Sequence, residues 1–218
     1  MTIRLVVADD HAMIRMGLRL VVENADGIEV VGEAADGHQA IAVARRERPD
    51  VLLLDLAMPV VDGLEAARTL LADPAPPRIV MLTTFGSDDN LQQALRAGVN
   101  GFLLKSSPPE HLVEAIRVAA AGDGLIDPAV TMRLIASFAA RPVLVPPPEL
   151  GTLTERERDV LLLLARGLSN REIAAEAGVG EATIRSHVAQ ILHKLGLRDR
   201  VQAVVLAYES GIVRPGET

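Results

Sequence analysis

The first half of the chain alternates short apolar runs with stretches of helical periodicity, and this alternation constrains the fold more than any other feature. The apolar runs are Ile3–Ala8, Ile28–Val31, Val51–Leu54, Ile79–Leu82 and Phe102–Leu104. Helical patterns follow them at residues 12–23, 37–48, 62–71, 88–97 and 108–121. Five strands that alternate with five helices predict an α/β fold with a doubly wound, five-stranded parallel sheet.

A proline-rich segment ends this pattern. Residues 141–151 include three consecutive prolines, which favour an extended, semi-rigid spacer and exclude a helix. One more short helix is expected before the segment, at residues 128–139. After it the pattern is entirely helical, with helices expected near 155–166, 170–177, 181–195 and 200–210. We therefore divide the chain into 1–125, a helical extension and linker at 126–151, and a second domain at 152–218.

Helix starts are marked by a repeated spacing of Ser or Thr followed three residues later by Glu. The spacing occurs at Ser107–Glu110, Thr154–Glu157 and Ser169–Glu172, and at the first of these a proline stands at the first helical position. Such capping boxes satisfy free backbone N–H groups at a helix N-terminus. Gly167, Gly178 and Gly196 fall just past the expected helix ends, where glycine is common.

Composition and charge narrow the function classes. The 218 residues contain no Cys, which excludes disulfides and thiolate metal sites. No apolar run approaches the roughly 18 residues of a membrane span, so a cytoplasmic protein without membrane partners is expected. The net charge is −7, all of it in residues 1–150; residues 151–218 carry nine basic and nine acidic residues. A neutral second domain is a weak electrostatic footprint for nucleic acid.

Polar side chains follow directly after four of the apolar runs. Asp9 and Asp10 follow the first run, Asp55 the third, Thr83 the fourth and Lys105 the last. In a parallel sheet these positions share the carboxyl edge, where open α/β sheets bind ligands. With strand order 2-1-3-4-5 the first and third strands are neighbours, so the three carboxylates come together.

Three clustered carboxylates repel one another unless a cation lies among them. Oxygen ligands without His or Cys suit Mg²⁺, which keeps several waters and prefers sites completed by phosphate. Lys105 and Thr83 could then hold the oxygens of a phosphoryl group on one carboxylate. Aspartate is a known nucleophile for phosphoryl transfer. A single Asp after a strand would be read as a turn former, but the whole set at one edge indicates a site.

Residues 1–125 resemble the receiver domain of response regulators. The resemblance rests on Ala8–His11, on Leu54–Pro59 with Asp62 and Gly63, on Leu82–Thr84 and on Gly101–Lys105. It implies that Asp55 is the phosphoacceptor, that Asp9, Asp10, Asp55 and the main-chain carbonyl of Ala57 hold Mg²⁺, that Thr83 and Phe102 form the switch, and that Lys105 pairs with the phosphate. Many receivers have Pro after this Lys, joined by a cis bond; here Ser106 follows, which leaves the bond open.

Two other classes of protein share parts of the pattern in this half of the chain. Phosphatases of the haloacid dehalogenase type also use an aspartyl nucleophile, but they carry a second Asp two residues later, where this chain has Ala57. A flavin-binding flavodoxin-like domain needs a Ser/Thr/Gly-rich phosphate loop after the first strand, which is not present in the sequence. The receiver therefore remains the preferred interpretation.

The second domain has the spacing of a helix-turn-helix. Helix 170–177, a glycine-containing turn and helix 181–195 have the right lengths. On the third helix one apolar stripe faces the core. The opposite face carries Ser186, Ala189, Gln190 and His193, with Thr183 and Arg185 near its two edges, and all of these but His193 are taken as candidate DNA contacts. Candidate phosphate contacts are Ser169, Asn170, Lys194, Arg198 and Arg200. Arg185 could reach guanine edges or only phosphate, and a helical bundle that binds protein alone remains an alternative.

This domain resembles a LuxR-type helix-turn-helix, and the whole chain resembles a NarL/FixJ-type two-component response regulator. The carrying motifs are Leu153–Glu157, Gly167–Asn170, Glu172–Ala174, Ala182–Val188 and Lys194–Ala203. Two departures are Gly180 at the recognition-helix N-cap, where Ser is usual, and Ala189, where some members have a basic residue.

The expected function follows from the two resemblances together. A cognate sensor histidine kinase would phosphorylate Asp55, and the phosphorylated homodimer would bind inverted-repeat DNA as a transcription regulator rather than as an enzyme. The last helix is apolar on too much of its circumference for its own domain, so an exposed stripe of Val201, Val204, Val205 and Tyr208 is expected to pair two copies. The rival is a phosphotransfer enzyme whose helical tail only dimerises.

Overall fold

The computed structural model describes residues 2–84, 88–127, 130 and 148–213. The chain forms two compact units, residues 1–127 and 128–218. The short helix expected at 128–139, apart from residue 130, and residues 141–147 of the proline-rich segment lie outside the described residues. In the described part of the chain, no helix combines the length and the apolar character that crossing a membrane requires.

The first unit is built on a parallel sheet with strand order β2-β1-β3-β4-β5-β6. The strands are β1 Ile3–Ala8, β2 Ile28–Ala34, β3 Val51–Asp55, β4 Arg78–Thr83, β5 Gly101–Leu104 and β6 Leu125–Ile126. The predicted order 2-1-3-4-5 is confirmed. The sheet has one strand more than the five expected, because β6 is only two residues long and so leaves no alternating pattern in the sequence.

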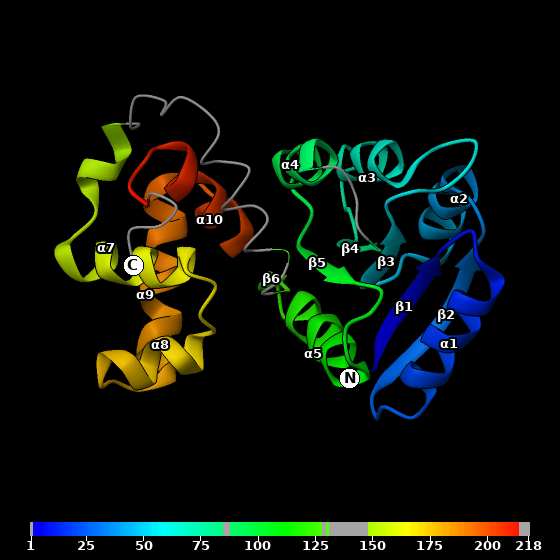
Figure 1. Ribbon diagram of the computed structural model, residues 1–218, viewed down its shortest axis with the longest axis horizontal. Coiled ribbons are helices and arrows are strands. Elements are labelled where there is room, and N and C mark those ends of the chain that lie inside the picture. The colour runs from blue at the N-terminus through cyan, green and yellow to red at the C-terminus, as the bar shows by residue number, and fades with distance from the viewer. Residues whose placement is uncertain (1, 85–87, 128–129, 131–147, 214–218) are drawn as a thin grey trace. The chain divides into compact units, whose positions relative to one another are not determined.

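Helices cover both faces of this sheet (Figure 1). They are α1 Ala12–Glu23, α2 Gly37–Glu47, α3 Gly63–Leu71, α4 Asp88–Ala97 and α5 Pro109–Ala120, as the periodicity predicted to within one residue. One face packs against α1 and α5 through a core that includes Val22, Leu112 and Ile116. Because side chains alternate along a strand, the other apolar residues of the central strands face the layer of α2, α3 and α4.

The capping box expected at Ser107 does not form. The N-cap of α5 is Pro108, which offers no side-chain acceptor, and Pro109 is the first helical residue. The Ser107 hydroxyl instead donates a hydrogen bond to Asp127 Oδ2 at 2.6 Å. The spacing to Glu110 was right for a cap, but Asp127, twenty residues further along the chain, is the better acceptor because it is charged and buried.

The second unit is helical: a 3-10 helix η1 Pro148–Thr152 precedes α7 Glu155–Ala165, α8 Asn170–Ala177, α9 Glu181–Leu195 and α10 Arg200–Glu209. Thr154 with Glu157 and Ser169 with Glu172 form complete capping boxes, as predicted. Gly178, with φ of 65°, ends α8 in the left-handed conformation that glycine adopts without steric cost, so the chain turns sharply into α9.

The end of the proline-rich segment differs from the expectation. An extended spacer was predicted through to residue 151, whereas η1 begins at Pro148, the last of the three prolines. A proline has the φ angle of a helical turn and lacks only an N–H that a first position leaves unused, so it can begin a helix. Leu150 packs against the core of the second unit, which favours the turn over an extended chain.

An ion pair between the buried Glu157 and the partly exposed Lys194 joins α7 to α9. Glu157 Oε2 accepts hydrogen bonds from Lys194 Nζ at 2.6 Å, from the Thr154 N–H at 2.8 Å and from the Thr154 hydroxyl at 3.0 Å. The Glu157 side chain is only 3% exposed. Lys194 and the Thr154 contacts lower the pKa of the Glu157 carboxyl to about 2, although burial alone would raise it.

The second unit is therefore expected to lose stability as the pH falls from about 4.5 towards 2. The folded pKa of Glu157 lies below its ordinary value of 4.5, so the folded state favours the charged form. Its contribution is complete above pH 4.5 and disappears as the carboxyl protonates, a loss on the order of 2 kcal/mol. Glu157→Gln should reduce the dependence of unfolding on pH in this window, measured by calorimetry at several pH values.

The matched control is Glu172→Gln, which removes the corresponding carboxylate of the second capping box. Glu172 is exposed and pairs with Ser169 alone in its box, so its replacement should change the pH dependence less. Equal effects of the two substitutions would contradict the role given to the Glu157–Lys194 pair.

Candidate functional site

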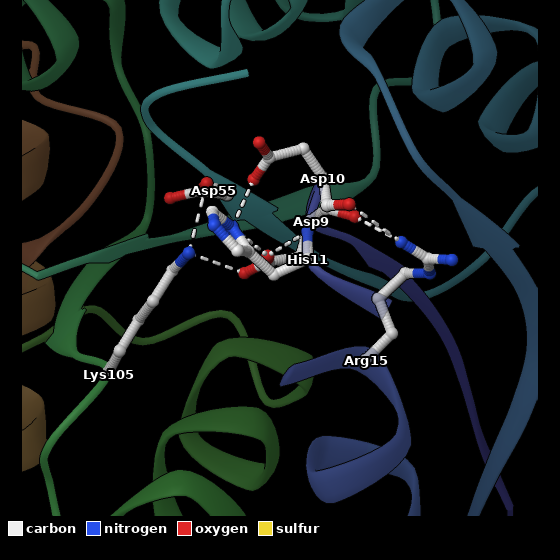
Figure 2. Close-up of polar contacts among 6 residues, drawn as sticks. All are labelled: Asp9, Asp10, His11, Arg15, Asp55 and Lys105. Atoms are coloured by element: carbon white, nitrogen blue, oxygen red, sulfur yellow. Dashed lines mark hydrogen bonds and ion pairs between the residues drawn. The ribbon is translucent and has the colours of Figure 1, made fainter. Parts of the chain in front are cut away.

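Three charged side chains meet at the carboxyl edge of the sheet. Lys105 Nζ lies 2.6 Å from Asp9 Oδ2 and 3.0 Å from Asp55 Oδ2 (Figure 2). All three are buried, with side chains at most 9% exposed. One ammonium group thus compensates two carboxylates that water scarcely reaches.

The sheet register explains why these residues meet. Ala8 pairs with Leu54 on the neighbouring strand. The next residues, Asp9 and Asp55, therefore lie side by side at the carboxyl ends of the two strands. Lys105 follows β5, and its N–H donates to the Thr83 carbonyl at 2.8 Å, which extends the β4–β5 ladder to the same edge. The arrangement is thus a direct result of parallel strands that end together.

The pKa values of Asp55 and Lys105 are both raised, but for different reasons. Burial raises the pKa of the Asp55 carboxyl above its ordinary value; Lys105 and a hydrogen bond from the Ala57 backbone oppose this, whereas the Asp9 charge adds to it. For Lys105, burial lowers the pKa, but the contacts with Asp9 and Asp55 outweigh it and leave the pKa raised. Lys105 is therefore a firmly charged cation at the site.

Asp10 and His11 complete the edge next to Asp9. His11 Nδ1 lies 2.6 Å from Asp10 Oδ1, and the His11 N–H donates to Asp9 Oδ1 at 2.9 Å. Among the described residues, Asp9, Asp10 and His11 form a group whose potential ligand atoms all lie within 4.8 Å of one another. Asp55 does not belong to this group; its carboxylate contacts Lys105 instead. His11 was quoted in the sequence motif but not selected as a site residue.

The donors present suit a hard cation. Asp10 Oδ1 is buried, and among the described residues its contact is with His11 Nδ1 at 2.6 Å, so a metal ion would share or replace this contact. Asp9, Asp10 and Asp55 offer carboxylate oxygens, which Mg²⁺ prefers; the His11 nitrogen is a ligand that Mg²⁺ does not favour. The residues at this edge therefore fit the metal that the sequence predicts.

The two switch candidates lie on adjacent strands. Thr83 ends β4 and is buried, and Phe102 in β5 is fully buried beside Met81. Phe102 lies on the face opposite Leu103, which belongs to the α1–α5 core, so it faces the layer that includes α4. The Lys105–Ser106 bond, which the sequence left open, is trans.

Gly63 lies against the backbone of Asp55, and the sequence alone assigns it no role. A Cβ placed there would lie 1.9 Å from the Asp55 carbonyl oxygen. Asp62 caps α3 by accepting from the Glu65 N–H at 2.8 Å, and the Gly63 N–H donates to the Leu56 carbonyl at 3.0 Å. The start of α3 thus packs directly on the backbone of Asp55. An Asp-Gly pair just before a helix and soon after a strand-end Asp is the signal that could have revealed it.

The recognition-helix candidates all lie on the exposed surface of α9: Thr183, Arg185, Ser186, Ala189 and Gln190. Arg185 is 65% exposed at its side chain and pairs with Glu181 Oε1 at 3.0 Å, one turn earlier. Exposed pairs of this spacing contribute only about 0.3–0.5 kcal/mol, so Arg185 can exchange Glu181 for another acceptor.

The candidate phosphate contacts divide into two groups. Ser169 and Arg198 are exposed. Lys194 instead pairs with Glu157, and Arg200 donates to Asn170 Oδ1 at 3.2 Å and to the Leu168 carbonyl. Lys194 and Arg200 are thus engaged in contacts within the unit, although Lys194 remains exposed, and their role as phosphate contacts stays a prediction.

The expected exposed stripe on α10 is not there. Val204 and Tyr208 belong to the core of the second unit, and the Tyr208 hydroxyl donates to the Ala165 carbonyl at 2.8 Å. Val201 and Val205 lie outside this cluster but are also buried, at 0% and 8% exposure. Periodicity showed correctly that α10 is apolar on several sides; it could not show that all of these sides are covered.

An α/β unit with an aspartate–lysine site, followed by a helix-turn-helix unit, defines a class of protein in which a signalling domain is joined to a DNA-binding domain. Residues 5–117 match the response regulator receiver domain family, and residues 151–207 match the family of bacterial regulatory proteins of the luxR type. The chain therefore belongs to the two-component response regulators of the NarL/FixJ type, which act as transcription regulators.

Similar proteins agree along nearly the whole length. An uncharacterized transcriptional regulatory protein of Bacillus subtilis, YxjL, is 39% identical over 97% of this chain and 98% of its own. The response regulator protein VraR of Staphylococcus aureus is 37% identical over 98% of this chain and all of its own. The crystal structure of the response regulator ChrA of a heme-sensing two-component system is 32% identical, covers 97% of this chain and 99% of ChrA, and has a TM-score of 0.55.

Proposed function

We propose that Asp55 accepts a phosphoryl group from a cognate sensor histidine kinase and that this state controls dimerisation and binding to inverted-repeat DNA. The observation that carries the proposal is the position of Lys105 Nζ, within 3.0 Å of the carboxylates of Asp9 and Asp55 at the open edge of the sheet. A fixed cation beside a buried carboxylate suits a group that gains negative charge during the reaction.

In the proposed reaction an Asp55 oxygen forms a bond to phosphorus while the bond from phosphorus to the donor nitrogen breaks, which gives an acyl phosphate. Asp9, Asp10, Asp55 and the Ala57 carbonyl would hold Mg²⁺, which would supply positive charge for the phosphoryl oxygens. Lys105 exchanges its Asp55 contact for a phosphoryl oxygen, and the Thr83 hydroxyl donates to another. Water later removes the phosphoryl group.

The switch is proposed to run from Thr83 to Phe102. When the Thr83 hydroxyl turns towards the phosphoryl group, the space next to Phe102 changes, which biases β5 and α4 between two arrangements. Because Val201 and Val205 are buried, pairing of two copies through them requires a rearrangement that exposes them. We propose that the phosphorylated state favours this exposure.

The coupling of Asp55 phosphorylation to dimerisation and DNA binding can be measured with beryllofluoride, which mimics a phosphoryl group on aspartate. The modified protein should be more dimeric by sedimentation and should bind its operator about 5–150 times more tightly, the usual range for linked sites. Unchanged oligomeric state and unchanged affinity, with Asp55 demonstrably modified, would overturn the control mechanism. A protein that shifts no DNA fragment specifically would favour the phosphotransfer enzyme.

Arg185→Ala is expected to weaken operator binding by about 1–3 kcal/mol if the side chain reads a base edge. Arg185 is exposed on α9, and its partner Glu181 is a weak competitor, so the guanidinium is available to DNA. The measurement is a titration with operator and with random DNA of equal length. Arg158→Ala, at an exposed position of α7, is the control and should change neither affinity by more than about twofold. Equal loss on both DNAs would restrict Arg185 to phosphate contact.

A further inference from the structure

We propose that Arg15 is a positioning residue that fixes the Asp9–Asp10 loop in the shape that binds Mg²⁺. The inference rests on the proposed function, because it concerns the same site, and it assigns a role to a residue outside the proposed ligand set. Arg15 lies in α1 and is mostly buried, at 18% exposure of its side chain.

The contacts of Arg15 are with the main chain of the loop. Nη1 donates to the Asp9 carbonyl at 2.7 Å and also reaches the Asp10 carbonyl at 3.4 Å. Nε lies 3.5 Å from Glu33 Oε2, on the neighbouring strand β2. One guanidinium therefore joins two consecutive peptide groups of the loop to the edge of the sheet.

These contacts leave the carboxylates available. In Figure 2, Lys105 and Arg15 lie on opposite sides of Asp9 and Asp10, with Lys105 at the carboxylate side and Arg15 at the carbonyl side. A cation that paired with the carboxylates from both sides would compete with a metal. Arg15 instead adds positive charge near the acidic cluster without occupying a ligand oxygen.

Among the described residues, the main chain of the loop has few other restraints, because the 2.6 Å contact of His11 Nδ1 is with the Asp10 carboxylate and not with a peptide group. His11, the N-cap of α1, makes no side-chain cap hydrogen bond. The Asp9 N–H donates to the Ala34 carbonyl at 3.1 Å, and Asp9 Oδ1 accepts from the His11 N–H at 2.9 Å. These bonds fix Asp9; for the peptide groups that follow it, Arg15 supplies the contact that reaches both carbonyls. Partners that orient metal ligands without touching the metal commonly change metal affinity 10–100-fold when they are lost.

Arginine is suited to this task where lysine is not. Its planar guanidinium is always charged and directs several N–H groups at once, so it can hold a carbonyl and Glu33 together. A lysine at the same position would keep the charge but would present a single nitrogen. Replacement of Arg15 by Lys therefore distinguishes the effect of the guanidinium geometry from the effect of the positive charge.

Arg19 provides a matched control on the same helix. It pairs with Glu23 at 2.7 Å and with Glu33 at 3.3 Å, so it shares the Glu33 partner of Arg15. Its contacts are with carboxylates at the surface, not with the loop carbonyls. Arg19→Met removes the same charge from α1 and disturbs the same glutamate, but leaves the loop restraint in place.

The test compares wild type, Arg15→Met, Arg15→Lys and Arg19→Met as full-length chains. Calorimetric titration with MgCl₂ alone should show Mg²⁺ binding about 10-fold or more weaker in Arg15→Met, intermediate in Arg15→Lys and within twofold of wild type in Arg19→Met. In labelling by acetyl phosphate, Arg15→Met should need more Mg²⁺ for half-maximal rate but approach the wild-type rate at saturation. A general structural defect would lower the saturated rate too.

Mg²⁺ affinity of Arg15→Met within twofold of wild type, or an equal loss in Arg19→Met, would overturn the positioning role while leaving the proposed function intact. If Arg15→Met does not fold, Arg15→Lys decides, and a wild-type affinity in that variant overturns the role. A wild-type protein that neither binds Mg²⁺ nor accepts label would overturn both the proposed function and this inference.

Discussion

Replacement of Asp55 by Asn is expected to abolish labelling by acetyl phosphate while the receiver unit keeps its fold. An amide has almost the shape of the carboxylate but is not a nucleophile for phosphorus, so the acyl phosphate cannot form. Lys105 keeps its contact with Asp9 at 2.6 Å, so its charge stays compensated. Mass spectrometry of the intact protein after incubation with Mg²⁺ and acetyl phosphate would detect one added phosphoryl group in the wild type and none in the variant.

Asp50→Asn is the matched control for this substitution. Asp50 directly precedes β3 and accepts from the Arg4 N–H at 2.8 Å, at the opposite end of the strand that Asp55 terminates. An Asn at 50 can accept the same hydrogen bond, and labelling should remain at the wild-type level. Labelling of Asp55→Asn, or its loss in Asp50→Asn, would place the acceptor elsewhere.

Gly63→Ala is expected to destabilise the receiver unit by about 3 kcal/mol and to reduce labelling. The added methyl group would lie 1.9 Å from the Asp55 carbonyl oxygen and 3.1 Å from Leu56 Cα, so backbone must move. Overpacking of this kind typically costs about 1–3 kcal/mol, and backbone adapts less readily than a side chain. Thermal unfolding followed by calorimetry would measure the change in the receiver transition.

Gly17→Ala makes the same chemical change where space is available. Gly17 lies within α1, with no atom within 4 Å of an added Cβ. Alanine in a helix interior is about 0.5–1 kcal/mol more favourable than glycine, so this variant should unfold at a higher temperature than the wild type. Shifts of the same sign in both variants would show that backbone freedom, not the contact with Asp55, governs Gly63.

Much of the fold could be predicted because it depends on local patterns. Apolar runs and helical periodicity predicted the strands and nearly all helix bounds, and the resemblance to receiver domains implied the strand order. The rule that parallel strands end at one edge was enough to predict that Asp9, Asp55 and Lys105 meet, as they do here. These predictions need only the position of each residue along its own element.

What the sequence could not give was the choice among partners that are distant along the chain. Ser107 had a correct capping spacing, yet its hydroxyl bonds Asp127. Lys194 and Tyr208 were placed on surfaces by periodicity, and each has a partner in α7 or at its end, Glu157 and the Ala165 carbonyl. The role proposed for Arg15 could not be predicted for the same reason, because its acceptors are main-chain carbonyls, which every residue has. Periodicity assigns a residue to a face, but only packing decides what that face meets.

The internal use of Lys194 and Arg200 has a consequence for how salt would act on DNA binding. Each phosphate that a protein neutralises releases condensed counterions and steepens the salt dependence of the affinity by roughly 0.9 in logarithmic slope. While Lys194 joins α9 to α7 and Arg200 joins α10 to α8, these two cations do not neutralise phosphate, and residues 151–218 carry as many acidic as basic residues. A single copy would therefore release few ions and bind weakly, over a wide range of ionic strength. Occupancy of an operator would then depend on how many copies pair, rather than on the ionic composition of the cell.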